Sequence, residues 1–228
     1  MKINISREIL DLIIIHLVFA LICIIVIIIP FTNYMGIKLF LLVVIYNIIL
    51  PVFGYLRKHF EWINIWVFVF LISLFQIWPD WFLSAELGIL VFPEDGFLKI
   101  GTVSLYMAGL WTIPLFLITL AGLKMQEHFS KLITYVSIGI ISLLIFGIAE
   151  QSMWILQSWY PQNVYVIGNL AIYIIIPEII LGVSTYFSFI IIREKNHILK
   201  IPISFIIMIL YLGTAVFFYF LFDQILIP

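Results

Sequence analysis

The sequence predicts an all-α protein that crosses a membrane several times. Hydrophobic residues make up 65% of the 228 residues and charged residues 10%, against roughly 25% charged residues in soluble chains. The mean hydropathy is +1.26. Long apolar runs alternate with short polar stretches, and about 20 apolar residues suffice to cross a bilayer as a helix. We therefore expect one helical transmembrane domain over residues 1–228.

Seven apolar runs are long enough to be transmembrane helices: 9–30, 36–55, 62–78, 103–123, 132 to about 157, 164–192 and 201–222. The first run is longer than a signal-peptide core and no small-residue cleavage site follows it, so we expect it to be retained. Asn47 lies in the middle of the second run. A polar amide at that depth predicts a hydrogen bond to a neighbouring helix.

The segment 76–101 differs from the rest because aromatic residues, carboxylates, Pro and Gly occur together in it. Pro79 suits the first position of a helix, and Asp80 suits its first turn, where the helix dipole favours a carboxylate. The segment is too interrupted for a plain span and too apolar for a plain loop. It predicts a short helix near 79–90 that lies at the outer membrane interface without crossing.

Positive charge predicts the orientation. With seven spans and the N-terminus inside, nine of the 11 Lys and Arg residues fall on the inner side, and Lys38 and Lys99 fall outside. An eighth span at 79–92 would divide them almost evenly, against the positive-inside rule. We therefore predict an N-terminus inside and a C-terminus outside. The many Ile and the preference for Lys over Arg are typical of an AT-rich genome, which indicates a prokaryotic plasma membrane.

Four carboxylates are candidates for catalysis. Asp80 is explained more simply as a residue in the first turn of a helix, where the dipole favours a carboxylate. Glu86 lies among Leu83, Leu87 and Leu90, so it would face either the headgroup region or the interior of the bundle.

Glu150 and Glu178 are the other two candidates. Glu150 comes 19 residues after Lys131, which places it about 28 Å along the fifth span, near the outer boundary. Glu178 stands 14 residues from each end of the sixth run, so we expect it near the midplane. An ionisable side chain there indicates a functional site, although a protonated Glu bonded to a freed carbonyl would be structural.

These residues predict a cavity in the outer leaflet. We expect Glu150 and Glu86 to face it together, with one of the two acids protonated because like charges repel. Glu178 would form its floor or be a separate buried group. Its walls would be the aromatic residues predicted at the same level: Trp154, Trp78 or Trp81, and Trp111 or Tyr106.

Several classes of function are excluded. The net charge of −1 gives no basic surface for nucleic acid. Cys23 is the only cysteine, and no His-Glu-x-x-His, Gly-x-Ser-x-Gly or phosphate-loop motif occurs. The seventh span has no Lys for a retinal Schiff base. We expect neither a metal nor a cofactor, and the sequence indicates no particular protein partner.

Two short motifs resemble those of known membrane proteins. The Tyr160-Pro161-Gln162 segment is similar to the Pro-Gln pair of PQ-loop transporters, but it occurs once and in a predicted outer loop. Pro93-Glu94-Asp95 and Pro177-Glu178 resemble the Pro/Glu-rich signature of small membrane-bound carotenoid cyclases. Each match covers only a few residues, so the sequence assigns no family.

Three functions remain open. An enzyme of the cyclase or isomerase type would act on a lipid-like or isoprenoid molecule by acid/base chemistry, with aromatic faces stabilising cationic intermediates. A secondary transporter would use Glu178 at the midplane. A non-catalytic binding or assembly subunit would use the acids structurally. We favour the enzyme.

Overall fold

The computed structural model describes residues 7–226. In this range seven helical segments are long and apolar enough to cross a membrane: Arg7–Ile28, Met35–Leu56, Phe60–Glu86, Met107–Gln126, Lys131–Leu156, Ile172–Ile192 and His197–Leu226. These segments lie within a few residues of the predicted runs, except that the third continues to Glu86 and the sixth begins only at Ile172. The chain is therefore a multi-pass membrane protein with a helical bundle fold.

Each span is one helix or several helical pieces that follow one another end to end. The first two are α1 (Arg7–Ile28) and α2 (Met35–Leu56). The third joins α3 (Phe60–Phe75), α4 (Ile77–Trp81) and η1 (Phe82–Glu86). The fourth joins α5 (Met107–Leu110) and α6 (Thr112–Gln126), and the fifth joins α7 (Lys131–Ser152) and η2 (Met153–Leu156). The sixth joins η3 (Ile172–Ile174) and α8 (Ile175–Ile192), and the seventh joins η4 (His197–Leu199), α9 (Lys200–Tyr219) and η5 (Phe220–Leu226).

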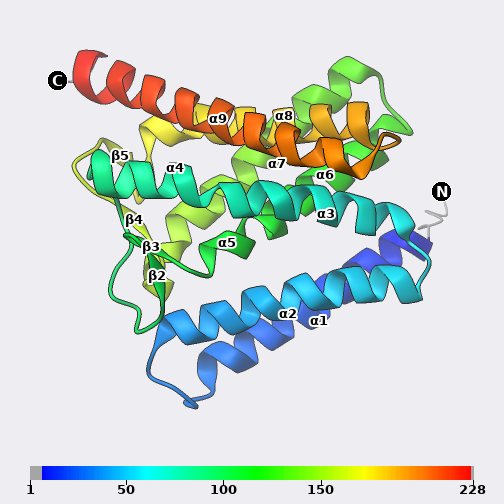
Figure 1. The fold of residues 1–228 in the computed structure, drawn as a ribbon, viewed down its shortest axis with the longest axis horizontal. Coiled ribbons are helices and arrows are strands. Elements are labelled where there is room, and N and C mark those ends of the chain that lie inside the picture. Colours follow the sequence, from blue (N-terminus) through cyan, green and yellow to red (C-terminus); the bar gives the residue numbers. More distant parts are fainter. Residues whose placement is uncertain (1–6, 227–228) are drawn as a thin grey trace.

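The helices from α3 to α9 pack around one apolar core, and α1 packs mainly on α2 at one side (Figure 1). The Asn47 amide joins these parts: it donates to the Gly109 carbonyl at 3.1 Å and accepts from the Trp66 indole at 3.1 Å. The predicted interhelical bond of Asn47 is thus confirmed.

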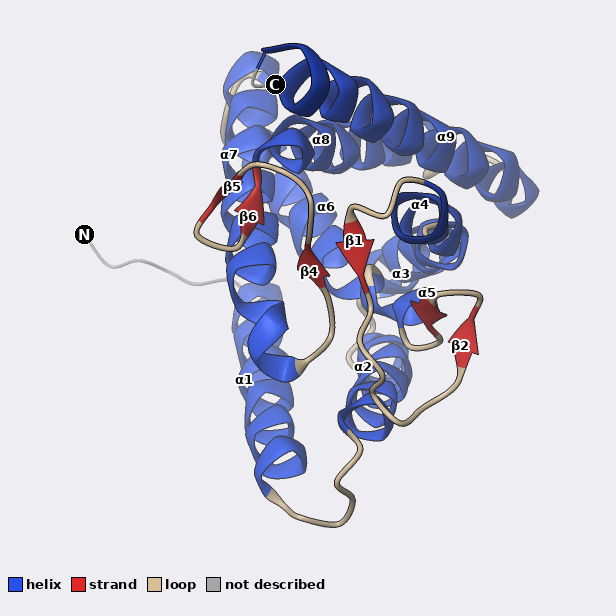
Figure 2. Ribbon diagram, turned by 90° about the vertical axis from the view of Figure 1, so that its left-hand side faces the viewer, coloured by secondary structure: helices blue, strands red, loops and turns tan. Residues whose placement is uncertain are grey.

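Three short antiparallel strand pairs cover one end of the bundle (Figure 2). β1 (Leu90–Val91) pairs with β4 (Tyr160–Pro161), β2 (Lys99–Ile100) with β3 (Val103–Ser104), and β5 (Val166–Ile167) with β6 (Leu170–Ala171). The β1–β4 pair connects the long loop after the third span to the loop after the fifth. This end therefore has a cover built from the chain itself, which we call the strand-covered end.

The prediction of a separate interfacial helix at 79–90 is wrong. Pro79 does not begin a new helix: the Asp80 amide still donates to the Gln76 carbonyl at 3.2 Å, so the third span continues to Glu86. The last turn is a π-helix, in which the Leu87 amide reaches the Phe82 carbonyl at 3.1 Å. Proline at the first helical position and proline inside a helix give the same local pattern, so the sequence did not distinguish them.

The prediction that Glu178 lies at the midplane is also wrong. Residues 164–171 are apolar but form the β5–β6 hairpin, whose turn contains Gly168 at φ +67°. The sixth span therefore begins at Ile172, and Glu178 lies six residues, or about 9 Å, from that end. This shift brings Glu178 to the same end of the bundle as Asp80 and Glu150.

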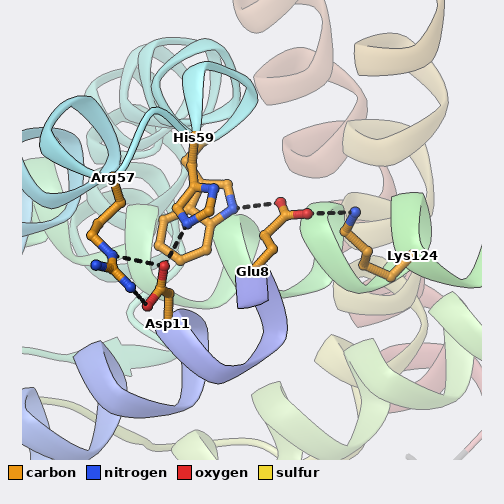
Figure 3. Close-up of polar contacts among 6 residues, drawn as sticks. Glu8, Asp11, Arg57, His59 and Lys124 are labelled. Carbon is orange, nitrogen blue, oxygen red and sulfur yellow. Dashed lines mark hydrogen bonds and ion pairs between the residues drawn. The ribbon is translucent and has the colours of Figure 1, made fainter. Parts of the chain in front are cut away.

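The opposite end is tied by ion pairs (Figure 3). Asp11 of α1 accepts from Arg57 at 2.6 Å and from His59 at 2.8 Å. Glu8 accepts from Trp62 at 2.9 Å and pairs with Lys124 of α6 at 2.7 Å. We call this the ion-paired end. The cluster holds α1 to the α2–α3 turn and to α6.

Candidate functional site

Asp80 lies inside the bundle near the strand-covered end. Asp80 is 2% exposed, and one of its carboxylate oxygens accepts a hydrogen bond from the Trp111 indole at 3.2 Å. Since the third span is continuous, Asp80 is not in the solvent-exposed first turn that its sequence context suggested. No basic side chain contacts it among residues 7–226. Asp80 is therefore a buried acid with a neutral partner.

Glu150 lies in the last turn of α7 and lines the same cavity as Asp80. Its Oε1 accepts from the Trp159 indole at 2.8 Å. Trp159 belongs to the loop between η2 and β4, which folds back because the β1–β4 pair holds the loop against the end of the third span. The covering loop thus supplies the hydrogen-bond donor to this acid.

Glu178 occupies the first turn of α8, directly after Pro177. It is 3% exposed and has no hydrogen-bond or ion-pair partner in the described part of the chain. An enclosed carboxyl without a partner is costly, because its hydration is lost and nothing replaces it. The structure therefore keeps at this position an acid that packing alone would disfavour.

Two adjoining cavities connect the three acids. The first, of about 20 Å³, is lined by Asp80 and Glu150 together with Trp111, Trp159, Tyr173 and Tyr211, among others. The second, of about 230 Å³, lies between the fourth span, α7 and α8, and both Glu150 and Glu178 line it. Glu150 is common to the two cavities. The three acids are close enough for their charges to act on one another.

The second cavity is otherwise apolar. Its remaining lining comes from Met107, Leu110, Trp111, Ile113, Pro114, Leu117, Ile145, Phe146, Ala149, Met153 and Trp159. Among these side chains only the two indoles carry a polar atom that can donate a hydrogen bond, and that of Trp159 is bound to Glu150. The cavity has the character of a site for an apolar small molecule, with carboxyl groups at one end.

The predicted pair of Glu86 and Glu150 is not formed. Glu86 is exposed at the end of η1 and lines neither cavity. The third span carries Asp80 into the bundle instead. Six residues separate the two acids, which is 1.7 turns, so they face different sides of the helix.

The predicted aromatic residues also divide into those that line the cavities and those that do not. Trp111 lines both cavities, whereas Trp78 is 57% exposed. Trp154 lines an outer groove beside Tyr160, and its indole donates to the Gln151 carbonyl at 3.0 Å. Trp81 packs over Gly101, where an added Cβ would lie 2.7 Å from its ring. Of the aromatic candidates named so far, only Trp111 reaches the acids.

Tyr106 is buried behind the site without lining it. Its hydroxyl lies 2.8 Å from the Ser158 Oγ. Burial raises the pKa of the Tyr106 phenol to about 12, so the hydroxyl is neutral at physiological pH. This contact fixes the loop residue next to Trp159, and Tyr106 therefore positions the cover over Glu150.

Sequence reasoning missed Trp159, Tyr173 and Tyr211. Trp159 lies in a segment predicted as loop, and Tyr173 lies in a segment predicted as part of a long sixth helix. Both reach the acids only because the strand pairs fold these segments over the end of the bundle. Tyr211 lies on α9, 131 positions after Asp80, in a run whose aromatic residues have no periodic pattern that singles it out. A local signal existed only for the acids.

The fold and site together define a multi-pass helical membrane protein with buried acids at one end of its bundle. Comparison with known families gives one match: residues 77–222 match the DUF6989 family, a domain of unknown function. The chain belongs to this family. The matched region contains Asp80, Glu150 and Glu178, and it leaves out α1, α2 and α3. No curated protein and no solved structure matches the chain.

Proposed function

We propose that this protein binds a lipid-like or isoprenoid small molecule in the cavity of Glu150 and Glu178, and acts on it by acid/base chemistry as a cyclase or isomerase does. The observation that carries the proposal is the unpartnered, enclosed carboxyl of Glu178 facing an otherwise apolar cavity. A structural role would be expected to give this acid a hydrogen-bond partner. A role toward a bound molecule leaves it free.

The grouping of the acids supports proton transfer. Three carboxylic acids that share a small apolar region cannot all be ionised without strong repulsion, so the group retains a proton. Glu150 lines both cavities and can pass a proton between Asp80 on one side and Glu178 on the other. In this proposal Glu178 gives a proton to the bound molecule or takes one from it, and Asp80 and Glu150 set its protonation state.

The aromatic walls support a cationic intermediate. Trp111 packs against Phe146 and Tyr211, with ring centroids 5.6 Å apart in both pairs. The faces of such rings stabilise a positive charge by their quadrupole. Proton addition to a carbon–carbon double bond would create this charge, and loss of a proton at another carbon would remove it and leave an isomer of the starting molecule.

We further propose that the strand-covered end is outside and the N-terminus inside a prokaryotic plasma membrane, with the cavity in the outer leaflet. The positive-inside bias supports this orientation, since Arg57, Lys124, Arg193 and Lys200 all lie at the ion-paired end. The C-terminus would then be outside.

Cysteine labelling tests the orientation. In a Cys23→Ala background, single Ser130→Cys, Gln162→Cys and Asn196→Cys variants are treated in intact cells with a membrane-impermeant thiol reagent. Only the Gln162→Cys protein should react, because residue 162 is at the strand-covered end. Reaction of either other variant from outside would reverse the proposed orientation.

The position of Glu178 favours the enzyme over the transporter, because the residue lies six positions from one end of its span, away from the centre. The binding or assembly subunit differs from the enzyme in one measurable respect: it leaves the bound molecule unchanged. An unbiased lipid profile of cells with and without the protein tests this. The enzyme predicts a pair of compounds of equal mass that change in opposite directions, and identical profiles would contradict it.

A further inference from the structure

A second cavity system, separate from the site of Asp80, Glu150 and Glu178, lies at the ion-paired end. It is a groove of about 610 Å³ between the start of α3 and the turn that joins α8 to η4. Phe60, Ile63 and Val67 of α3 form an apolar strip along it, and charged side chains from both elements border it. Because it lies where two spans meet their connecting turns, it is at the depth of lipid headgroups.

The charges of the groove have both signs. Arg193 lies between Glu61 and Glu194, at N···O distances of 3.6 Å and 3.7 Å. These distances exceed the roughly 2.7–2.9 Å of charge-assisted hydrogen bonds. The guanidinium and the two carboxylates therefore keep unused capacity to donate and to accept.

His197 adds a directed donor. Lys200 is fully buried, and its ammonium contacts the Asn64 carbonyl, the Asn64 side-chain oxygen and the His197 Nδ1. Since an ammonium only donates, Nδ1 must accept, and the ring proton of neutral His197 is on Nε2. No residue from 7 to 226 takes this proton, and the exposed His197 ring borders the groove.

We propose that this groove binds a phospholipid with an ethanolamine headgroup. The lipid phosphate would accept from Arg193 and from the His197 Nε2, and the primary ammonium would donate to Glu61 and Glu194. Its acyl chains would lie along Phe60, Ile63 and Val67. Charge complementarity distinguishes this lipid: phosphatidylglycerol has the phosphate but no cation, and phosphatidylcholine has a cation without N–H donors.

The test uses native mass spectrometry of the purified, delipidated full-length protein. Phosphatidylethanolamine, its mono- and dimethylated forms, phosphatidylcholine and phosphatidylglycerol are added one at a time. Retention should fall stepwise with methylation. Since exposed charge pairs contribute little each, we expect about a fivefold difference between the ends of the series. Equal retention across the series, or strongest retention of phosphatidylglycerol, would overturn the proposal.

Variants of the two groove carboxylates test whether the preference for ethanolamine arises in this groove. Glu61→Gln combined with Glu194→Gln should remove the preference for ethanolamine while retaining the binding of phospholipid in general. The matched control is Glu94→Gln, which removes an exposed carboxylate at the strand-covered end, and it should leave the whole series unchanged. A preference that survives the double variant would place the ethanolamine site elsewhere and contradict the proposal. If the double variant does not fold, the methylation series in the unmodified protein still decides.

Soluble headgroup distinguishes a lipid from a free phosphate compound. Glycerophosphoethanolamine should not displace the bound lipid at equal concentration, because it lacks the acyl chains that contact α3. Displacement at equal concentration would show a site for the soluble molecule and overturn the assignment to a lipid.

Discussion

At the ion-paired end, Asp11 and Glu8 each contact a cation and a second hydrogen-bond donor: Arg57 and His59 for Asp11, Lys124 and Trp62 for Glu8. At the strand-covered end, Asp80 and Glu150 each accept from a neutral indole, and Glu178 has no partner among residues 7–226. The same residue types therefore occupy two environments. Among these five acids, the two that are matched by cations join helices, and the three that are not matched line a cavity.

This difference indicates how to separate structural from functional acids in a helical membrane protein. Burial alone does not do so, since Asp11 and Glu178 are both enclosed. The partners do: an acid that the fold needs has its hydrogen bonds satisfied within the fold, and an acid that acts on a ligand keeps an oxygen free.

The largest effect on stability is expected at Asp11. Asp11→Asn leaves Arg57 and His59 without their counter-charge, and the unfolding temperature should fall clearly. Glu178→Gln replaces a buried carboxyl group that has no partner among residues 7–226, so its unfolding temperature should be unchanged or higher. Thermal unfolding in detergent compares them, with Glu94→Gln as the exposed control. A larger loss for Glu178→Gln than for Asp11→Asn would contradict the comparison.

A smaller effect is expected when the donor to Glu150 is removed. Trp159→Phe keeps an aromatic wall but deletes the N–H that the Glu150 Oε1 accepts. Loss of such a bond is worth about 0.5–1.5 kcal/mol, so the affinity for the bound molecule should change by about two- to tenfold. Titration of the cavity ligand, once the lipid profile identifies it, measures this. Trp154→Phe is the control, and an equal change there would show a non-specific effect.

The smallest effect on function is expected at Asn47, whose bonds are satisfied within the bundle and whose side chain lines neither cavity. Asn47→Leu removes the contacts with Gly109 and Trp66 and should cost about 0.6–1.7 kcal/mol of stability, as interhelical hydrogen bonds in membranes do. Activity per folded molecule should not change. Loss of activity at full stability would assign Asn47 to the site.

Much of the fold was predictable because long apolar runs can form only helices in a bilayer. The seven spans and the interhelical role of Asn47 follow from that constraint. What the sequence did not reveal depends on contacts between distant segments. Residues 164–171 are as apolar as a helix but pair as a hairpin, and this moves Glu178 from the predicted midplane to the covered end.

The candidate site was predictable only in part for the same reason. Acids in apolar runs stand out, so Asp80, Glu150 and Glu178 were recognised individually. Their grouping was not, because Pro79 continues a helix and turns Asp80 inward while Glu86 is exposed. Trp159 reaches Glu150 only through the β1–β4 pair, which joins segments about 70 residues apart.

The most direct test of the central claim compares two variants in cells that lack their own copy of the protein. Glu178→Gln and Asp11→Asn are expressed to equal amounts of folded protein, and the lipid profile is measured for each. Asp11→Asn should restore the profile of the unmodified protein, whereas Glu178→Gln should leave it as in cells without the protein. Full restoration by Glu178→Gln would contradict the claim that the unpaired acid acts on a bound molecule.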